Sequence, residues 1–329
     1  MGSFRQALVA ATAIATSSAY QFSEMDLHFV NWVAKHGRSY ADTEEYAFRL
    51  HQFALSDESI RRINMTPGAT HVAGHNKFSD WSREEKTAYS SGGGLIRYSE
   101  VKDEDLLDTS DLPTEVNWIT KGAVGSVRDQ GNCGSCWAFS AVGSIESAHQ
   151  IKTGELLDLS EQQCVDCDKD SVGCTGGYAD NCLWYVYDNG GISLEKDYPY
   201  QAGADMCIAD YGGAVEVKTV NPVKSKSESQ LMAAIALGPT SVSVDAETDL
   251  FFHYTSGILN DDSCGTKLDH AVIAVGYGTD EATGLDYYLV RNSWGADWGE
   301  SGYIRLARGP EDGWGMCGIQ EMSVYPTTN

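Results

Sequence analysis

The sequence predicts an α+β protein in which helical segments come first and β-rich segments follow them. Between residues 20 and 188, apolar residues recur in several segments at steps of three and four, the spacing of one helix face. Beyond Val215 the pattern changes to short β-rich runs with alternation, at 240–245, 270–277, 287–292 and 302–307. This order indicates two subdomains, one mainly helical and one mainly built from strands.

Composition divides the chain into three segments. Residues 1–19 combine Arg5, a short apolar run and small residues at the end, as a secretory signal peptide does. We expect cleavage after Ala19, and no run of the sequence is apolar for long enough to span a membrane. Residues 90–111 form a linker that begins with glycines and ends with acidic residues, the kind of segment that proteases cut. The expected segments are therefore 1–19, 20–111 and 112–329.

Two patterns stand out in the second segment. Six residues follow one another at steps of four, four, three, four and four, so they lie along one face of a single helix. Residues 74–80 then read Gly74-x-Asn76-x-Phe78-x-Asp80, an alternation that predicts a short strand. The six residues of the helix face are Glu45, Arg49, Phe53, Ser56, Ile60 and Asn64.

The formal charge of −24 excludes two classes of partner. A surface this acidic argues against binding to nucleic acids and to anionic membranes. It fits a protein that works in acid, where carboxylates begin to protonate and their mutual repulsion falls. Simple solubility explains the same charge, so the charge alone does not separate these two explanations.

Residues 130–140 hold two cysteines and several small residues, followed by an apolar run. Because helical spacing starts at Cys136, this cysteine is expected where a loop becomes a helix. The partial positive charge of a helix N-terminus favours a thiolate over a thiol. Six residues upstream, Gln130 has an amide that can donate to an oxyanion beside the sulfur. Disulfide formation in a secreted protein is the alternative role for both cysteines, Cys133 and Cys136.

The cysteine count supports an oxidising compartment. If Cys136 is a free nucleophile, eight cysteines remain, an even number that suits disulfides. Zinc binding competes as an explanation for Cys164-x-x-Cys167, but a second pair with metal-ligand spacing is missing.

Three motifs give the chain a resemblance to a known family. Cys-Gly-Ser-Cys-Trp at 133–137 is the local signature of papain and the cathepsins. His270, within Leu-Asp-His-Ala-Val, follows Cys136 by 134 residues, and Asn292, within Arg-Asn-Ser-Trp-Gly, follows it by 156. The chain resembles the papain-family cysteine proteases of the cathepsin L type. The resemblance implies a helical half that carries the cysteine, a β-barrel-like half that carries the histidine and asparagine, and an active-site cleft between them.

The resemblance also implies roles for individual residues. Cys136 would be the nucleophile and His270 its ion-pair partner and later general acid. Asn292 would orient the imidazole under the cover of Trp294, while Gln130 and the backbone N–H of Cys136 would form the oxyanion hole. The positions that match the substrate-binding sites of the family are Gly176, Gly177, Tyr178, Ala179, Ser243, Leu268, Ala271 and Met322.

The function implied is that of a cysteine endopeptidase that hydrolyses proteins through a thioester acyl-enzyme. An inactive relative would lack the nucleophile, which this chain keeps. An exopeptidase would need a segment that blocks one end of the cleft, and no insertion with paired histidines lies between Cys174 and Cys207. Apolar Met322 at the floor of the specificity pocket predicts a bulky apolar residue two positions before the cut. A shift of one residue would place Glu321 there and reverse this preference.

By the same resemblance, residues 20–111 would be an inhibitory propeptide, with Ser56 where the family has asparagine. Removal is expected at acid pH by a cut between Glu100 and Leu112. Independently of the resemblance, the histidines of this region suggest a pH trigger that loosens the propeptide near pH 6, with ordinary surface histidines as the alternative. Asn64 opens a glycosylation sequon whose occupancy stays open. The five histidines of this region are His28, His36, His51, His71 and His75.

Three disulfides carry over from the family, and parity adds a fourth. The fourth rests on two cysteines expected in short helices that flank one glycine turn, with two free thiols as the alternative. Neither a cofactor nor a metal is expected. Expected partners are protein and peptide substrates, the chain's own propeptide and cystatin-type inhibitors, and we expect a monomer in the secretory pathway, in the lysosome or vacuole or outside the cell. The four pairs are Cys133–Cys174, Cys167–Cys207, Cys264–Cys317 and Cys164–Cys182.

Overall fold

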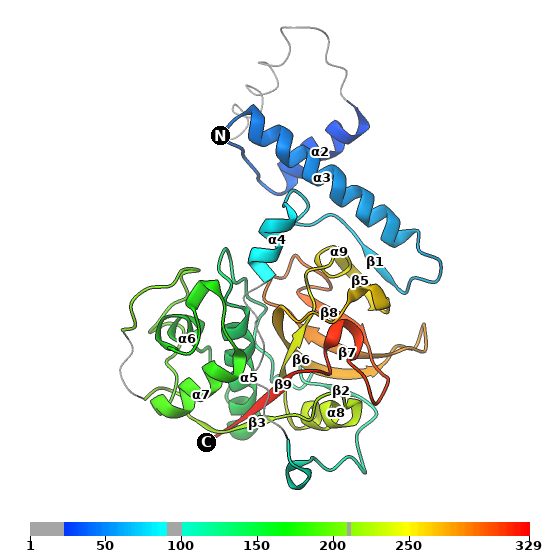
Figure 1. Ribbon diagram of the computed structural model, residues 1–329. Helices are drawn as coiled ribbons and strands as arrows, with labels where there is room; N and C mark the ends of the chain where they lie inside the picture. The colour runs from blue at the N-terminus through cyan, green and yellow to red at the C-terminus, as the bar shows by residue number, and fades with distance from the viewer. Residues whose placement is uncertain (1–22, 91–100, 209–211) are drawn as a thin grey trace.

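The structure has an N-terminal segment, a helical half and a half built around a sheet (Figure 1). The computed structural model describes residues 23–90, 101–208 and 212–329. The expected signal peptide and residues 91–100 of the expected linker lie outside these described residues. In Figure 1 the N-terminal segment, residues 23–90, lies above the other two parts, and its last helix, α4, reaches the boundary between the two halves.

The N-terminal segment is mainly helical, as the sequence predicts. Ser23 opens α2 with a capping box, and the side chain of Asp42 caps α3. Phe29, Trp32 and Phe53 form a small core between these two helices. The elements of this segment are α2 at Glu24–Lys35, α3 at Thr43–Asn64, β1 at His71–Ala73 and α4 at Arg83–Ser90.

The strand predicted at residues 74–80 is wrong. These residues form a loop of turns, and the strand of this region is β1, just before it. The side chain of Asn76 bonds to the backbone of this turn in place of a neighbouring strand: its Oδ1 accepts from the backbone N–H of Phe78 at 3.0 Å. Its Nδ2 donates to the carbonyl of Phe252 in the sheet half at 2.6 Å. The alternation therefore marks a turn that anchors the N-terminal segment and buries Phe78 completely.

Asn64 of the sequon uses its side chain to hold β1. Its Oδ1 accepts from the backbone N–H of Ala73, and its Nδ2 donates to the carbonyl of the same residue, both at 2.8 Å. The end of α3 is therefore tied to β1, which pairs antiparallel with β5 of the sheet half.

The helical half follows the predicted helices. Ser160 caps α6 by accepting from the backbone N–H of Gln163, and α5 ends where Gly154 adopts a left-handed φ of 82°. Trp137, Ile145 and Leu183 are fully buried in the core of this half. The helices are α5 at Cys136–Thr153, α6 at Glu161–Cys167 and α7 at Ala179–Asn189.

The sheet half contains the strands predicted beyond Val215, interrupted by two helices, α8 at Glu228–Leu237 and α9 at Asp249–Phe252. The strand order is β1-β5-β8-β7-β6-β4-β9-β3, with β2 paired to β6. Within the described residues β1 and β3 lie at opposite ends of this order, so the sheet is not closed into a barrel. The remaining strands are β2 at Val116–Asn117, β3 at Val217–Pro222, β4 at Thr240–Val244, β5 at Tyr254–Leu259, β6 at His270–Thr279, β7 at Asp286–Arg291, β8 at Tyr303–Ala307 and β9 at Ser323–Thr328.

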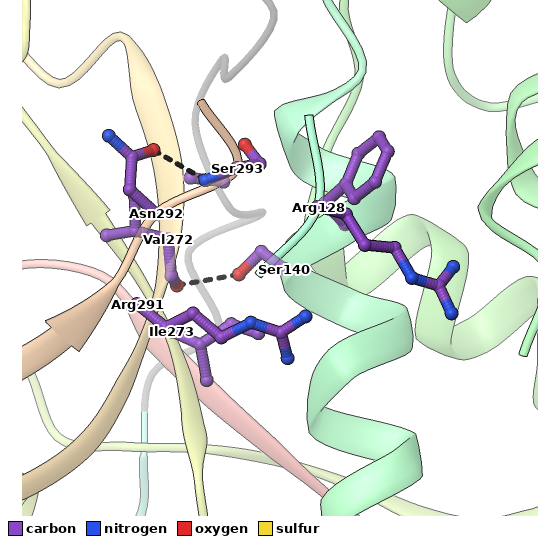
Figure 2. Close-up of a pocket in the computed structure, with 9 residues that line it drawn as sticks. Arg128, Ser140, Val272, Ile273, Arg291, Asn292 and Ser293 are labelled. Carbon is purple, nitrogen blue, oxygen red and sulfur yellow. Dashed lines mark hydrogen bonds between the residues drawn. The ribbon is translucent and has the colours of Figure 1, made fainter. Parts of the chain in front are cut away.

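The two halves meet where α5 packs against β6. Gly143 of α5 is required there, since a Cβ at this position would lie 2.5 Å from Cδ1 of Ile273. Ser140 donates to the carbonyl of Val272 at 2.7 Å, as Figure 2 shows, and its Oγ lies 2.6 Å from Oγ of Ser241. Close packing and buried hydrogen bonds therefore fix α5, and with it the position of its first residue.

The structure contains the four expected disulfides. The Cα atoms of the fourth pair, Cys164 and Cys182, are 5.6 Å apart, a normal separation for a bridge. The zinc explanation is wrong, because Cys164 and Cys167 each belong to a disulfide. Cys136 is the one free cysteine, and across the described ranges no helix is long and apolar enough to cross a membrane.

Candidate active site

The free cysteine lies at the start of a buried helix. Cys136 is the first residue of α5, and its side chain has no solvent exposure. The preceding loop turns at Gly131, whose φ of 60° suits glycine. The position predicted from the sequence, at the junction of loop and helix, is confirmed.

His270 and Asn292 come from neighbouring strands of the sheet half. His270 is the first residue of β6, and Asn292 follows the last residue of β7. Nε2 of His270 lies 2.8 Å from Oδ1 of Asn292. Since Oδ1 can only accept, Nε2 carries a proton and the neutral ring presents Nδ1 as its basic nitrogen. Oδ1 also accepts from the backbone N–H of Ser293 at 2.7 Å, which fixes the amide (Figure 2).

Cys136 lies beside this pair without a hydrogen bond to it. The backbone N–H of Ala271, next to His270 in the chain, is among the groups that lower the pKa of the Cys136 thiol, so the sulfur is close to the start of β6. In the described part of the chain, Nδ1 of His270 is buried and has no hydrogen-bond partner. It is therefore free to take up the proton of a nucleophile.

Trp294 closes the histidine–asparagine pair from one side. Its ring centroid lies 4.8 Å from that of His270, and it is fully buried against Trp298 and Phe252. This contact is consistent with the predicted cover over the bond between His270 and Asn292, which stays a prediction.

Gln130 is held from both its backbone and its side chain. Its backbone N–H donates to the carbonyl of Ser293 at 2.9 Å, and its Oε1 accepts from Oγ of Ser293 at 2.7 Å. Because Oε1 is occupied, Nε2 is left as the donor, and it reaches the carbonyl of Cys133 at 3.0 Å. Ser293 thus orients the amide so that Nε2 of Gln130 points toward the loop that carries Cys133 and Cys136. The sequence did not predict this role of Ser293, although the residue directly follows Asn292.

The N-terminal segment covers this site. The carbonyl of Tyr89, in α4, accepts from Nε2 of Gln130 at 3.2 Å. The ring of Tyr89 lies 5.7 Å from that of Trp294, and Phe78 lies 5.1 Å from the same ring. A main-chain carbonyl of the N-terminal segment therefore accepts a hydrogen bond from the same amide that is expected to stabilise an oxyanion.

Burial determines the protonation of the pair in this covered form. Burial raises the pKa of Cys136 to about 12, although nearby backbone N–H groups, first that of Ala271, oppose the shift. Burial lowers the pKa of His270 to about 4, against the hydrogen bond to Asn292. In the covered form burial therefore favours a neutral thiol and a neutral imidazole, while the thiolate and imidazolium expected in the working enzyme stay a prediction.

The glycine turn expected to contact substrate lies next to the nucleophile. Gly176 has a φ of 138°, which suits only glycine, and a Cβ on Gly177 would lie 2.5 Å from the indole of Trp137. A disulfide from Cys174 to Cys133 ties the turn to the loop before α5. Tyr178 and Ala179 follow, at the start of α7.

Two of the expected pocket residues lie on paired strands, Ser243 on β4 and Ala271 on β6, and Met322 lies just before β9. Ser243 of β4 pairs with Ala271 of β6, and its backbone N–H donates to the carbonyl of Met322 at 3.0 Å. Met322, Ala271 and Ala179 belong to the same apolar cluster as Cys136. Leu268 lies two residues before His270 in the chain, outside that cluster.

The side chain of Glu321 contacts polar residues, whereas that of Met322 packs against an apolar cluster. Its carboxylate accepts from Oγ of Ser225 at 3.0 Å and lies 3.7 Å from Nζ of Lys226. Of the two residues that competed for the pocket floor, Met322 is the one that packs into the cluster around Cys136.

In the covered state we expect the thiol of Cys136 to react slowly with alkylating reagents. With the pKa of Cys136 raised by burial, we expect iodoacetamide to alkylate the intact chain at pH 7 at least about 100-fold more slowly than the chain without its N-terminal segment, since each pKa unit changes the thiolate fraction tenfold. Mass spectrometry over time measures the rates. Cys136→Ser is the control, because it should take up no label if the other cysteines stay in disulfides. Equal rates for the two forms would contradict this account.

Comparison with known proteins assigns both parts of the chain. A family model for papain family cysteine proteases matches residues 112–327, and one for the cathepsin propeptide inhibitor domain matches residues 29–85. Papaya proteinase 4 of Carica papaya is 43% identical over 310 residues, which cover 92% of this chain and 86% of that protein.

Two solved structures of precursors share the fold. Recombinant stem bromelain precursor has a TM-score of 0.84 at 37% identity and matches 93% of this chain and 99% of its own. Digestive procathepsin L 3 of Tenebrio molitor has a TM-score of 0.82 at 33% identity and matches 93% of this chain and all of its own, 100%. The chain belongs to the papain family of cysteine proteases and is a cysteine peptidase with an N-terminal propeptide inhibitor domain.

Proposed function

We propose that the chain is the zymogen of an endopeptidase, with a signal peptide at 1–19, an inhibitory propeptide at 20–111 and a peptidase domain at 112–329. The observation that carries this proposal is the position of the one free cysteine of the described residues. Cys136 lies at the N-terminus of α5, next to the bonded pair of His270 and Asn292. The fixed amide of Gln130 completes the set.

In the proposed mechanism, release of the propeptide exposes the pair to water and lets the proton move from Cys136 to Nδ1 of His270. The thiolate attacks the peptide carbonyl, and the oxyanion accepts hydrogen bonds from Nε2 of Gln130 and the backbone N–H of Cys136. His270 then gives the proton to the leaving amine, and a thioester joins the acyl group to the sulfur. Water, with its proton taken by His270, hydrolyses the thioester. Asn292 keeps the ring in place through both steps.

The nucleophile and its base are tested by substitution in the mature enzyme. Cys136→Ser and His270→Ala should each lower kcat on a fluorogenic peptide by at least about 1,000-fold, because each removes one half of the reacting pair. The matched control is Glu155→Gln, at an exposed position just after α5 in the peptidase domain, which should leave kcat of the mature enzyme unchanged. Turnover within tenfold of wild type in either variant would disprove the assignment.

We propose that the pocket of Ser243, Ala271 and Met322 binds the residue two positions before the cut. Its floor is apolar Met322, while the neighbouring carboxylate of Glu321 is engaged by Ser225 and Lys226. Burial of a leucine or phenylalanine side chain in such a pocket contributes about 1.5–3 kcal/mol.

A peptide library varied only at that position tests the pocket. Wild type should prefer leucine and phenylalanine over arginine by about ten- to a hundredfold in kcat/KM. Met322→Glu should move the preference toward arginine, since a carboxylate on the floor pairs with a guanidinium. Glu321→Gln is the matched control and should keep the apolar preference. If arginine outranks leucine in wild type, the pocket assignment fails.

We propose that acid releases the propeptide, and the buried charges at its interface support this. Nζ of Lys86, in α4, lies 3.1 Å from Oδ1 of Asp249 and 3.2 Å from Nε2 of His253. Ser59 of α3 donates to Asp249 at 2.6 Å. Lys86 is only 8% exposed and His253 fully buried, so this cluster joins two propeptide helices to the peptidase domain away from water.

Three histidines link this interface to pH. Burial lowers the pKa of His71, His75 and His253, for His253 to about 3 with Lys86 as the next cause. We take the pKa of each histidine to return to about 6.5 when the propeptide is released. The docked form then keeps this stabilisation in full above pH 6.5, and it loses it as the pH falls toward the lowered pKa, because the released form binds the proton more tightly. Acid therefore favours release. The carboxylates that partly oppose these shifts are Asp261 for His71, Asp57 for His75 and Asp249 for His253.

Two variants should move the pH of half-maximal activation in opposite directions. Lys86→Met removes the cation held by Asp249, so activation should begin at a higher pH, by about half a unit to one unit. Combined His71→Gln and His75→Gln removes two proton acceptors and should lower that pH by a similar amount. His51→Gln is the exposed control.

Activity after incubation at each pH gives the midpoint, and mass spectrometry of the products locates the cut, which we expect between Glu100 and Leu112. An unchanged midpoint in the double histidine variant would reject the proton-linked release, and a mature N-terminus inside α5 would reject the boundary at residue 111.

The disulfides and the expected signal peptide support a protein of the secretory pathway, delivered to a vacuole or lysosome or exported. In this role it would act on proteins and peptides as a monomer, with its own propeptide and cystatin-type proteins as inhibitors.

A further inference from the structure

A tyrosine outside the proposed catalytic set holds both ends of the loop before the nucleophile. The hydroxyl of Tyr200 lies 2.7 Å from the backbone carbonyl of Gln130 and 2.5 Å from Oγ of Ser135. Gln130 and Ser135 are fully buried, and Ser135 is the residue that precedes Cys136. One side chain thus bridges the two ends of the turn at residues 130–135.

The direction of each hydrogen bond follows from counting protons. A carbonyl can only accept, so Tyr200 gives its single proton to Gln130. Its oxygen then accepts from Ser135, whose hydroxyl becomes the donor. Burial raises the pKa of Tyr200, which keeps this proton in place throughout the acid and neutral range. Both bonds are therefore present at any pH at which the enzyme would work.

Tyr200 is itself fixed to the helical half. Its ring packs edge-on against Phe139 of α5, with centroids 4.8 Å apart, and its backbone N–H donates to Oε1 of Glu195 at 2.9 Å. Glu195 lies 3.8 Å from Arg128, a mostly buried guanidinium that also pairs with Glu161. The hydroxyl is thereby held against the same helix that carries Cys136.

The two loop ends carry the two proposed oxyanion donors. One is Nε2 of Gln130, and the other is the backbone N–H of Cys136, whose peptide bond begins at the carbonyl of Ser135. A shift of either end would move one donor relative to the other, and oxyanion stabilisation depends on donors held at hydrogen-bond distance from one developing charge.

We infer that Tyr200 is a positioning residue for the oxyanion hole: its hydroxyl sets the distance between the side-chain donor of Gln130 and the backbone donor of Cys136. The inference rests on the proposed roles of Gln130 and Cys136, and it adds a residue that contacts neither substrate nor the reacting atoms.

The test is Tyr200→Phe in the mature enzyme, which removes the hydroxyl and keeps the ring on Phe139. We expect kcat to fall about tenfold with KM unchanged, because the loss is confined to the transition state. Affinity for a peptide aldehyde, whose adduct with the thiol carries an oxyanion, should fall by a similar factor. The rate of alkylation by iodoacetamide, which forms no oxyanion, should stay as in wild type.

Tyr198→Phe is the matched control. It lies two residues away, and its hydroxyl donates to Asp166 at 2.9 Å, far along the chain from the loop at 130–135. It should leave kcat, aldehyde affinity and alkylation unchanged. Ser135→Ala is a second test that keeps Tyr200 intact, and it should lower kcat and aldehyde affinity together by a smaller factor than Tyr200→Phe.

The outcomes separate the inference from the proposed function. Equal losses of alkylation rate and aldehyde affinity in Tyr200→Phe would mean a general disturbance of the site and would overturn the inference, as would an unchanged kcat. If Tyr200→Phe does not fold, an unchanged aldehyde affinity in Ser135→Ala overturns it instead. Failure of the proposed function shows differently, as a wild-type enzyme that neither cleaves peptides nor binds the aldehyde.

Discussion

The close contact between α5 and β6 is the constraint on which the site depends. Cys136 and His270, the proposed nucleophile and base, come from opposite halves of the peptidase domain, so no local structure can bring them together. Gly143 lets the helix approach within the reach of Ile273, and Ser140 bonds to the carbonyl of Val272 behind the catalytic pair. Once the helix is fixed at that distance, its first residue must lie beside the first residues of the strand. The position of Cys136 relative to His270 is therefore a consequence of how α5 packs against β6.

Short motifs made much of this predictable. The helix that starts at Cys136, the strand that starts at His270 and the cap at Ser160 each follow from local patterns whose physical causes act over a few residues. The fourth disulfide, from Cys164 to Cys182, followed from parity and from the shared glycine turn, and the structure contains it. These features could be predicted because each is determined by neighbours in sequence.

The features that could not be predicted depend on residues far apart in the chain. The alternation around Asn76 resembled a strand, but its amide finds the carbonyl of Phe252, 176 residues later. The contacts of Tyr89 and Tyr200 with Gln130 span 41 and 70 residues. The expectation of a thiolate in the working enzyme considered the dipole of α5 and a nearby imidazole, and the sequence provides no measure of the burial that raises the pKa of Cys136 in the covered form.

At the proposed active site, the covered form differs in two ways from the proposed working enzyme. The carbonyl of Tyr89 is bonded to the amide of Gln130, where a substrate carbonyl would be polarised. In the same covered form, burial raises the pKa of Cys136 and lowers that of His270. An ion pair in that buried setting would pay for desolvation of both charges, so the neutral form prevails. Two observations therefore support the proposed inhibition by the propeptide: its carbonyl accepts a hydrogen bond from the amide of the proposed oxyanion hole, and burial in the covered form disfavours the two charges of the proposed ion pair.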